Sequence, residues 1–244
     1  MFPAVPQRSG AHSLQAIVLA GGYGNRLRAV VADVPKPMAP VGGRPFLSYV
    51  FDNLAEHGFR VVVVAVSWLH ESIVSAFGDN YRGLELRYSI EPEPLGTGGA
   101  IKQSFQYIND DLAFVLNGDT FQRLPYEPML RLAERERSDV VVAVRAVKNA
   151  DRYGIVKLEG TRIAKFSATG ANGPGLINAG AYLVRRSLVE GQNLGKAFSF
   201  ERDVLLPGVH SQVITAYQID GNFIDIGIPE DYERAGYEIP KWFA

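Results

Sequence analysis

The chain has 244 residues, 47% of them hydrophobic, and its 25 basic and 26 acidic side chains leave a formal net charge of -1. Such a length allows one large α/β domain with a sizeable core, and the charge balance argues against broad binding to nucleic acid or acidic membranes. The absence of cysteine excludes disulfides, thiolate metal sites and cysteine nucleophiles.

The N-terminal residues 1–13, MFPAVPQRSGAHS, lack the apolar segment of a signal peptide. No later apolar run reaches the roughly 18 residues that a membrane helix needs. We therefore expect a tail over residues 1–13, followed by a single domain over residues 14–244. This domain is expected to reside in the cytoplasm and to bind neither membrane nor nucleic acid.

Short apolar runs rich in β-branched residues predict strands in the first part of the chain. They cover Leu14–Ala20, Arg60–Val66, Asp111–Asn117 and Asp139–Val147. Near-continuous apolar runs are typical of parallel strands that are covered on both faces. Helical patterns fill the intervals, over residues 44–58, 69–78, 96–108 and 126–137. This alternation predicts an α/β fold with a doubly wound sheet.

The pattern changes after residue 147. Two short runs on either side of Gly160 predict a β-hairpin, and a helix is expected near Phe198–Leu206. A late strand over residues 223–227, FIDIG, precedes a last helix in which Pro229 suits the first turn. We expect a mixed, mostly parallel sheet, in which the β-rich middle part is an insertion that faces the substrate.

The segment LAGGYGNRL (19–27) places three glycines directly after the first predicted strand. Such a cluster alone is equally compatible with a tight strand-to-helix turn and with a phosphate-binding loop whose bare N–H groups form an anion nest. A Walker A loop is excluded because no Gly-Lys-Ser/Thr follows, and the dinucleotide fingerprint is incomplete because Leu27 replaces its third glycine. Arg26, with its planar fork, and Lys36, between two prolines, favour a triphosphate ligand.

Taken together, LAGGYGNRL and PKPM resemble the paired motifs of the sugar-1-phosphate nucleotidyltransferases, also called nucleotide-sugar pyrophosphorylases. The resemblance extends from Leu14 to about Ala235, through LGTGGA, LNGD, NAG and FIDIGIPEDY. It implies a Rossmann-like fold and a reaction in which a nucleoside triphosphate and a sugar 1-phosphate give a nucleotide-sugar and pyrophosphate. It also implies catalytic roles for Arg26 and Lys36. The residues that it implies for nucleotide binding are Leu19, Ala20, Gly21, Gly22, Gly24, Asn25, Glu91, Gly96, Thr97 and Gly118.

Two aspartates follow predicted strands far apart in the chain, Asp119 in LNGDTF and Asp225 in FIDIG. Spacing alone favours two unrelated turn residues, although Mg²⁺ commonly takes one or two carboxylates together with phosphate oxygens and water. The resemblance implies that Asp119 and Asp225 hold Mg²⁺. No separate base is expected, because the attacking sugar phosphate is already anionic and alignment with charge neutralisation would suffice.

The segment IEPEPLGTGGA (90–100) enters a predicted helix at Thr97, where three glycines either bring a flat base close to the backbone or simply start the helix. In relatives, the residue at the position of Glu91 contacts the nucleobase. An ionised carboxylate only accepts hydrogen bonds, and guanine offers two adjacent donors, N1–H and N2–H. A preference for GTP is therefore predicted, with Glu93 as the competing candidate for this contact.

The residues that the resemblance assigns to the sugar pocket are Asn117, Gly154, Asn178 and Gly180. The β-rich insertion is then the sugar-binding part, although Asn178 is alternatively a turn amide that caps its own strand. The chain departs from the family where relatives carry a Glu-Lys pair after the hairpin, because Ala168 and Thr169 stand there. Lys165 lies nearby, but adjacent strand residues face opposite sides, so the sugar-phosphate contact is left open.

Within the family, EPEPLGTGGA, LNGDTF and FIDIGIPEDYERA look most like the guanylyltransferases that act on D-glycero-D-manno-heptose 1-phosphate for surface polysaccharide synthesis. Mannose 1-phosphate guanylyltransferases are the alternative, and the resemblance is compatible with a homo-oligomer, a dimer or a tetramer. A non-catalytic nucleotide-sugar sensor would be expected to lose the lysine or a metal aspartate. A glycosyltransferase would carry an Asp-x-Asp motif near a strand end in the first two-thirds of the chain. Neither pattern matches this sequence.

Overall fold

A computed structural model of the chain describes residues 14–22, 34–167, 170 and 172–243. The predicted tail over residues 1–13 lies outside the described residues, and so do Gly24, Asn25 and Arg26 of the glycine loop. Residues 168 and 169, where the family's Glu-Lys pair is replaced, also lie outside them. The assignment of residues 14–244 to one domain stays a prediction.

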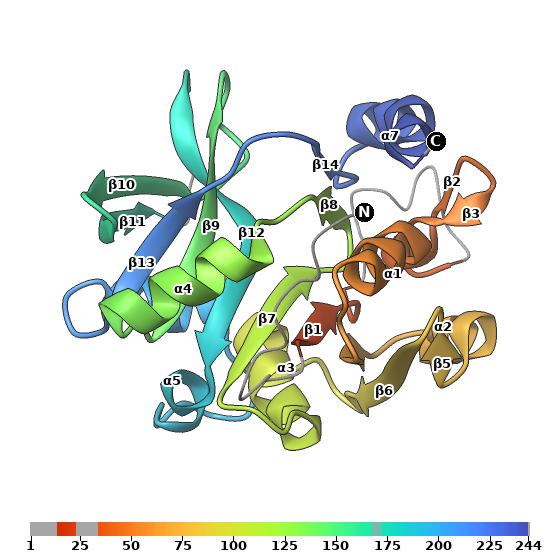
Figure 1. Cartoon of the computed structure of the whole chain (residues 1–244), viewed down its shortest axis with the longest axis horizontal. Coiled ribbons are helices and arrows are strands. Elements are labelled where there is room, and N and C mark those ends of the chain that lie inside the picture. The colour runs from red at the N-terminus through yellow and green to blue at the C-terminus, as the bar shows by residue number, and fades with distance from the viewer. Residues whose placement is uncertain (1–13, 23–33, 168–169, 171, 244) are drawn as a thin grey trace, which may run out of the picture.

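One ten-stranded sheet organises the described chain (Figure 1). In spatial order its strands are β10 (Ile155–Glu159), β11 (Arg162–Ser167), β13 (Ile214–Gln218), β9 (Val140–Val147), β12 (Gly175–Arg185), β7 (Leu112–Asn117), β1 (Gln15–Leu19), β4 (Val61–Val66), β6 (Leu84–Ile90) and β5 (Asn80–Tyr81). All four strands predicted for the first part of the chain are present, and β10 and β11 form the expected hairpin. Strands β6 and β13 were not predicted, and β12 was implied only as the strand that carries Asn178.

The strands β7, β1, β4 and β6 pair in parallel, as the sequence predicts for this part of the fold. Antiparallel β12 separates β7 from β9, and β9 pairs in parallel only with β13. The sheet is thus mixed, but the expected predominance of parallel pairing holds in one half and not in the other. A strand buried on both faces has the same apolar run whatever the direction of its neighbours, so the run at β9 could not reveal β12 beside it.

Helices and 3-10 turns join the strands. The helices are α1 (Phe46–Glu56), α2 (His70–Phe77), α3 (Gly96–Ser104), α4 (Tyr126–Glu136), α5 (Arg186–Glu190), α6 (Leu206–Gly208) and α7 (Pro229–Trp242). Short 3-10 helices cover Lys36–Met38 and Phe105–Tyr107, and a π-helical segment covers Phe200–Leu205. Pro229 opens α7 as predicted, whereas Pro45 is the residue before α1 rather than part of its first turn. None of the helices described is long and apolar enough to cross a bilayer.

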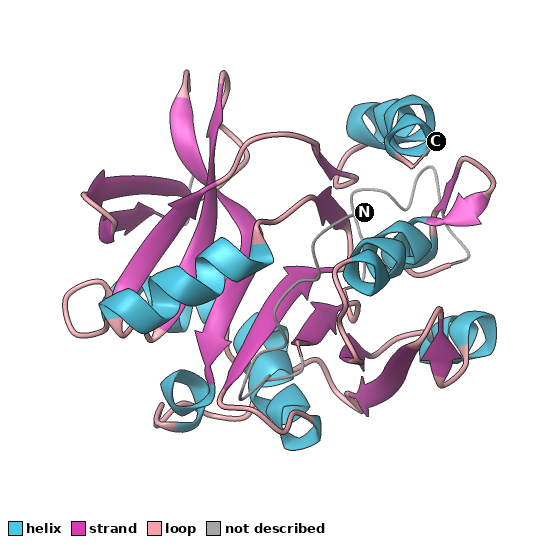
Figure 2. Ribbon diagram, in the orientation of Figure 1, coloured by secondary structure: helices cyan, strands magenta, loops and turns pink. Residues whose placement is uncertain are grey.

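Helices cover both faces of the sheet, as the ribbon in Figure 2 shows. Along β1, Ala16 and Val18 pack into the same buried cluster as residues of α1 and α4, whereas Ile17 packs into a second cluster with residues of α3 and α5. Successive side chains of a strand point to opposite faces, and here both faces are buried. This packing explains why the central strands are apolar along their whole length.

Two small sheets lie apart from the large one. They pair β8 (Thr120–Gln122) with β14 (Phe223–Asp225), and β2 (Pro40–Val41) with β3 (Arg44–Pro45). Because β8 comes directly after β7, the pairing with β14 returns a segment from the C-terminal part of the chain to the carboxyl end of β7. Helix α7 packs against β14 and β2 (Figure 1).

Candidate active site

A cavity of about 430 Å³ opens beyond the carboxyl ends of β1 and β7, which is where open α/β sheets bind ligands. Its lining includes these predicted site residues: Leu19, Gly21, Gly22, Lys36, Glu91, Gly96, Thr97, Asn117 and Asp119. They come from segments that are distant in sequence, so the fold gathers most of the predicted nucleotide residues that it describes. The predicted residues outside this lining are Ala20, Gly118, Gly154, Asn178, Gly180 and Asp225.

Ala20 and Gly118 support the floor of the cavity through their backbones. The Gly118 N–H donates to the carbonyl oxygen of Leu19 at 2.8 Å, and the Ala20 N–H donates to that of Ala65 at 2.8 Å. A Cβ on Gly118 would lie only 2.8 Å from the Leu19 oxygen. The glycine is therefore needed where the chain leaving β7 passes close to the end of its parallel neighbour β1, which is a structural reason for its place in the LNGD motif.

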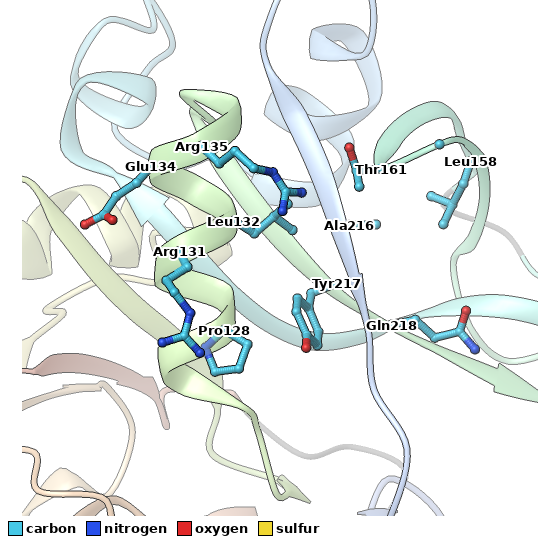
Figure 3. Close-up of a pocket in the computed structure, with 11 residues that line it drawn as sticks. Pro128, Arg131, Leu132, Glu134, Arg135, Leu158, Thr161, Ala216, Tyr217 and Gln218 are labelled. Atoms are coloured by element: carbon cyan, nitrogen blue, oxygen red, sulfur yellow. The ribbon is translucent and has the colours of Figure 1, made fainter. Parts of the chain in front are cut away.

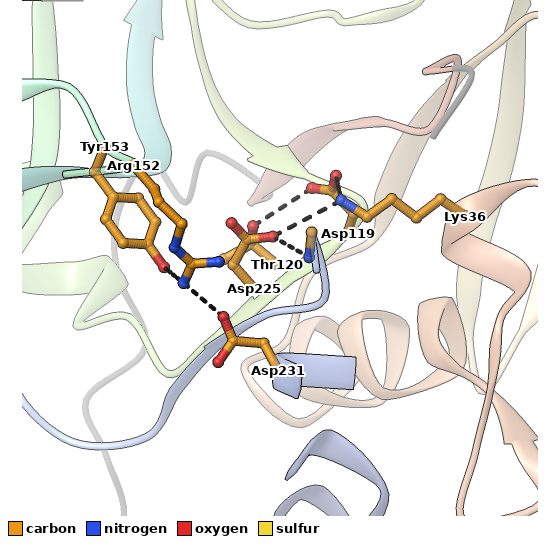
Figure 4. A network of polar contacts seen from close by, with 8 residues as sticks. Lys36, Asp119, Thr120, Arg152, Tyr153, Asp225 and Asp231 are labelled. Carbon is orange, nitrogen blue, oxygen red and sulfur yellow. Dashed lines mark hydrogen bonds and ion pairs between the residues drawn. The ribbon is translucent and has the colours of Figure 1, made fainter. Parts of the chain in front are cut away.

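Asp119 and Asp225 are brought together by the pairing of β8 with β14. Asp225 lies opposite Thr120 in this pair, and the Ile226 N–H donates to the Asp119 carbonyl oxygen at 3.0 Å. Lys36 Nζ lies 2.6 Å from Asp119 Oδ2 and 3.8 Å from Asp225 Oδ1 (Figure 4). The predicted catalytic lysine and the predicted metal ligands thus form one cluster at the cavity.

Lys36 is held by the backbone geometry of its proline-flanked segment. It opens the 3-10 helix that ends at Met38, whose N–H donates to the Pro35 carbonyl oxygen at 2.7 Å. The Lys36 side chain is only 11% exposed. The ammonium is therefore aimed at the two carboxylates by a short, restricted segment, which reduces the conformational entropy lost in placing it.

Among the described residues, Lys36 is the cation that forms ion pairs with both carboxylates. Burial and the neighbouring charge of Asp119 raise the pKa of Asp225, while Lys36 and the Gly227 N–H, which donates to Asp225 Oδ1 at 2.8 Å, act in the opposite direction. Among the described residues, no group of three or more histidine or acidic side chains could hold a metal. The part of the chain that the structure describes thus offers a metal two carboxylates here, a donor set suited to Mg²⁺ with phosphate oxygens.

Arg152 and Tyr153 lie on the side of Asp225 away from Lys36 (Figure 4), and neither was predicted as a site residue. Arg152 Nη2 forms an ion pair with Asp231 Oδ2 at 2.6 Å and donates to the Tyr153 hydroxyl at 3.1 Å (Figure 4). Burial and the charge of Asp225 raise the pKa of Tyr153. The segment DRYG (151–154) ends at Gly154, so a charged and an aromatic residue directly before that glycine were the available signal.

Glu91 is buried and lines the cavity, whereas Glu93 is exposed and outside the lining. Glu91 Oε2 accepts a hydrogen bond from the Leu95 N–H at 3.0 Å, and burial raises the pKa of the carboxyl group. A Cβ on Gly21 would lie 3.3 Å from Glu91 Oε1, so the glycine loop passes close to that oxygen. Of the two competing glutamates, the geometry favours Glu91.

The glycines of the GTGGA segment have a different role from the one expected. Gly96 has φ +67, and a Cβ there would lie 2.6 Å from the Phe198 carbonyl oxygen. A Cβ on Gly98 would lie 2.2 Å from the Phe198 ring, and one on Gly99 would lie 2.4 Å from the Lys196 carbonyl oxygen. The prediction that Gly98 and Gly99 open the backbone to a base is therefore wrong, because the segment around Phe198 occupies that space.

The four predicted sugar residues contact one another. A Cβ on Gly180, which has φ +72, would lie 2.5 Å from Asn117 Nδ2, so the two residues pack closely. The Gly180 N–H donates to Asn178 Oδ1 at 3.0 Å, and the Asn178 N–H donates to the Gly154 carbonyl oxygen at 2.9 Å. The Asn178 side chain thus bonds within its own strand, at an irregularity in the β9–β12 pairing, but in the interior of β12 and not as the turn amide capping a strand that the alternative interpretation described.

Residues 15–241 match the family model described as Nucleotidyl transferase. The chain belongs to the nucleotidyl transferase family. It is 38% identical over 229 residues to the D-glycero-alpha-D-manno-heptose 1-phosphate guanylyltransferase of Aneurinibacillus thermoaerophilus, a match that covers 94% of this chain and 100% of that one. The protein of the same name from Campylobacter jejuni is 40% identical over 220 residues, which covers 90% of this chain and 97% of that one.

A solved structure resembles the chain over nearly its whole length. The crystal structure of HddC from Yersinia pseudotuberculosis complexed with GMP-PN matches with a TM-score of 0.82 at 33% identity, covering 92% of this chain and 99% of that chain. The α/β architecture predicted from the alternating pattern is thus shared with this solved structure. These similarities extend through both halves of the sheet, including the β-rich part that follows β9.

A larger hollow of about 990 Å³ lies elsewhere, between α4 and β13 beside the β10–β11 hairpin (Figure 3). Its rim carries Arg131 and Arg135 of α4, whereas Tyr217 of β13 lines its floor. It contains none of the predicted site residues, and both arginines already form ion pairs with neighbouring glutamates. In this nucleotidyl transferase the smaller cavity, and not the larger hollow, gathers the side chains suited to phosphate chemistry.

Proposed function

We propose that this nucleotidyl transferase transfers GMP from GTP to a sugar 1-phosphate, releasing pyrophosphate, and that the sugar is D-glycero-α-D-manno-heptose. The observation that carries the proposal is the cluster of Lys36, Asp119 and Asp225 at a cavity whose buried end holds Glu91. The two aspartates are suited to hold a metal ion that also binds the phosphates of the nucleotide. The buried Glu91 carboxylate is suited to accept hydrogen bonds from a nucleobase that offers two adjacent N–H donors. The product would be a GDP-sugar for surface polysaccharide synthesis.

Asp119 and Asp225 would hold Mg²⁺. The fit rests on their chemistry: two carboxylates lie within 4 Å of one shared ammonium, and burial, followed by the charge of Asp119, raises the pKa of Asp225. When bound, Mg²⁺ would neutralise charge on the triphosphate and on the group being transferred. Side-chain carboxylates from two strand ends, completed by phosphate oxygens, are a common arrangement for this ion.

The transfer itself needs alignment more than proton movement. An oxygen of the sugar phosphate forms a bond to the α-phosphorus of GTP, the bond from that phosphorus to the β-phosphate oxygen breaks, and pyrophosphate leaves with the electron pair. Lys36 would stabilise negative charge on the reacting phosphates, and the backbone N–H groups of Gly21 and Gly22 would bind the triphosphate. Arg26 lies outside the described residues, and its role on the departing pyrophosphate stays a prediction.

Glu91 would select guanine. Its Oε2 is engaged by the Leu95 N–H, which orients the carboxylate, and Oε1 lies beside the glycine loop. Burial raises the pKa of the Glu91 carboxyl group. The N1–H and N2–H donors of a bound guanine would act in the opposite direction, because hydrogen bonds donated to the carboxylate favour its ionised form. The GMP-PN bound by the Yersinia relative supports a guanine nucleotide in this cavity.

Asn117, Gly154, Asn178 and Gly180 would form the sugar pocket. Close packing and hydrogen bonds link these residues to one another, from Asn117 at the end of β7 to Asn178 and Gly180 on β12. The names of the Aneurinibacillus and Campylobacter relatives support heptose over mannose. Mannose 1-phosphate is the alternative substrate.

The test is a pyrophosphate-release screen of ATP, CTP, GTP, UTP and dTTP against heptose, mannose and glucose 1-phosphates with Mg²⁺. We expect turnover with GTP and heptose 1-phosphate, with mannose 1-phosphate poorer. Preference for UTP or dTTP would contradict the role of Glu91, and preference for mannose would contradict the sugar assignment alone. Glu91→Gln should weaken the discrimination between GTP and the other triphosphates, with the exposed Glu93→Gln as the matched control.

A further inference from the structure

The carboxylate of Glu201 joins the nucleotide side of the site to the sugar side. Its Oε2 accepts hydrogen bonds from Thr97 Oγ1 at 2.7 Å and from Ser199 Oγ at 3.1 Å, and its Oε1 accepts one from the Tyr182 hydroxyl at 3.0 Å. Thr97 lies on α3 and lines the cavity, whereas Tyr182 lies on β12. One side chain from a third segment therefore bridges two elements that carry different parts of the site.

The hydrogen bonds continue from Tyr182 into the proposed sugar pocket. The Tyr182 hydroxyl accepts from Asn178 Nδ2 at 2.7 Å, and Asn178 Oδ1 accepts from the Gly180 N–H at 3.0 Å. Both ends of the Asn178 amide are therefore bonded. Its orientation depends on the Tyr182 hydroxyl, which in turn depends on Glu201.

The direction of these bonds makes Glu201 the terminal acceptor of the network. Thr97 Oγ1 accepts from the Phe200 N–H at 2.8 Å, so its own proton is directed to Glu201. Tyr182 is 1% exposed, and burial together with the charge of Glu201 raises the pKa of its hydroxyl well above its usual value, so it remains a donor. A carboxylate accepts on both oxygens, whereas a glutamine amide would turn its NH₂ group toward one of these donors.

We propose that Glu201 is a positioning residue that couples the two substrate sites, by holding Thr97 of the nucleotide cavity and Asn178 of the sugar pocket in one hydrogen-bonded unit. The proposal rests on the proposed function, which assigns Thr97 and Asn178 to the two substrates. Glu201 acts through Thr97 and Tyr182 rather than through contact with either substrate. Loss of its charge should disturb both sites, whereas loss of the Tyr182 hydroxyl should disturb only the sugar site.

The experiment measures KM for GTP and for heptose 1-phosphate, together with kcat, in Glu201→Gln, Tyr182→Phe and the wild type. Glu201→Gln should raise both KM values about tenfold, the loss expected from one charge-assisted hydrogen bond. Tyr182→Phe should raise KM for the sugar phosphate by a similar factor and leave KM for GTP unchanged. The double variant should be no worse than Glu201→Gln alone for the sugar phosphate, because both changes break the same link. Glu190→Gln, at an exposed site on α5, is the matched control.

The outcomes separate this proposal from the function on which it rests. An active wild type in which Tyr182→Phe raises both KM values equally, or neither, would overturn the coupling and leave the activity intact. A wild type inactive with every nucleotide and sugar phosphate would overturn both proposals. If Glu201→Gln fails to fold, Glu201→Asp, which keeps the charge, and Tyr182→Phe still give the split between the two KM values.

Discussion

Two clusters of carboxylates and cations in this protein have opposite charge balances. In the first, the Asp52 side chain of α1 is 1% exposed and binds two arginines, Arg44 Nη2 at 2.6 Å and Arg82 Nη1 at 3.1 Å. The Tyr81 hydroxyl donates to it as well, at 3.1 Å. One carboxylate thus has more positive partners than it needs, and the cluster ties α1 to the β5 edge of the sheet.

In the second cluster, Asp119 and Asp225 share Lys36, and their side chains are 33% and 26% exposed. Among the residues that the structure describes, two carboxylates here form ion pairs with one ammonium, and Arg152 lies beyond Asp225, at the cavity and within reach of solvent. The comparison indicates that a buried carboxylate with excess cations serves stability, whereas a partly exposed pair with too few cations is suited to bind one. The four predictions below test this distinction, beginning with the largest expected effect.

Asp119→Asn and Asp225→Asn should each lower kcat/KM for GMP transfer by more than about 100-fold, because even outer-sphere losses at metal sites cost about 10- to 100-fold. Asp52→Asn should leave kcat/KM at the wild-type level at temperatures where it remains folded. Pyrophosphate release with GTP and heptose 1-phosphate measures the effect. Full activity in both site variants would refute the metal assignment, and a comparable loss in Asp52→Asn would remove the distinction between the clusters.

The same substitutions should change stability in opposite directions. Asp52→Asn should lower the free energy of unfolding by about 2 kcal/mol, since charge-assisted hydrogen bonds are lost while both arginines remain partly solvated.

The folded-state pKa of Asp225 is raised, so stability from its protonated form is present at low pH and is lost as pH rises through that pKa. Asp225→Asn removes this loss and should raise the melting temperature near neutral pH without divalent cations. A lower melting temperature there would contradict the charge balance.

Lys36→Met should shift the titration of the acidic pair. Because Lys36 lowers the pKa of Asp225, its removal should raise that pKa further. As the pH is lowered, the variant should therefore lose Mn²⁺ binding at a higher pH than the wild type does. At higher pH, binding without nucleotide should be as tight as in the wild type or tighter, because a competing cation is gone. Electron paramagnetic resonance of Mn²⁺ across pH measures both effects. An unchanged pH dependence would show that Lys36 does not act on the pair, and Lys165→Met, at an exposed site on β11, is the control.

Arg82→Gln should have the smallest effect, lowering the free energy of unfolding by about 1 kcal/mol or less, because the Arg82 side chain is 57% exposed and Arg44 remains paired with Asp52. Denaturant unfolding measures it. A loss as large as that of Asp52→Asn would mean that the two arginines are not redundant.

Much of the fold could be predicted because its signals are local. Apolar runs marked the first four strands, and turn residues such as Gly160 marked the hairpin. The position of β12 could not be predicted, because its insertion between β7 and β9 depends on contacts between distant segments. The use of Gly98 and Gly99 was mistaken for the same reason, since the segment that covers them begins nearly a hundred residues later.

The sequence by itself determined the family, through the LAGGYGNRL and PKPM motifs, and with it the residue types suited to nucleotidyl transfer. It could name Asp119 and Asp225 but gave no spacing that required them to meet. Only the tertiary structure decided that meeting, by pairing β14 with β8, and it separated buried Glu91 from exposed Glu93. It also joined Thr97, Glu201 and Tyr182 into one network. The physical reason is that backbone propensity and periodicity act over a few residues, whereas burial, ion pairing and pKa shifts depend on neighbours brought together by folding.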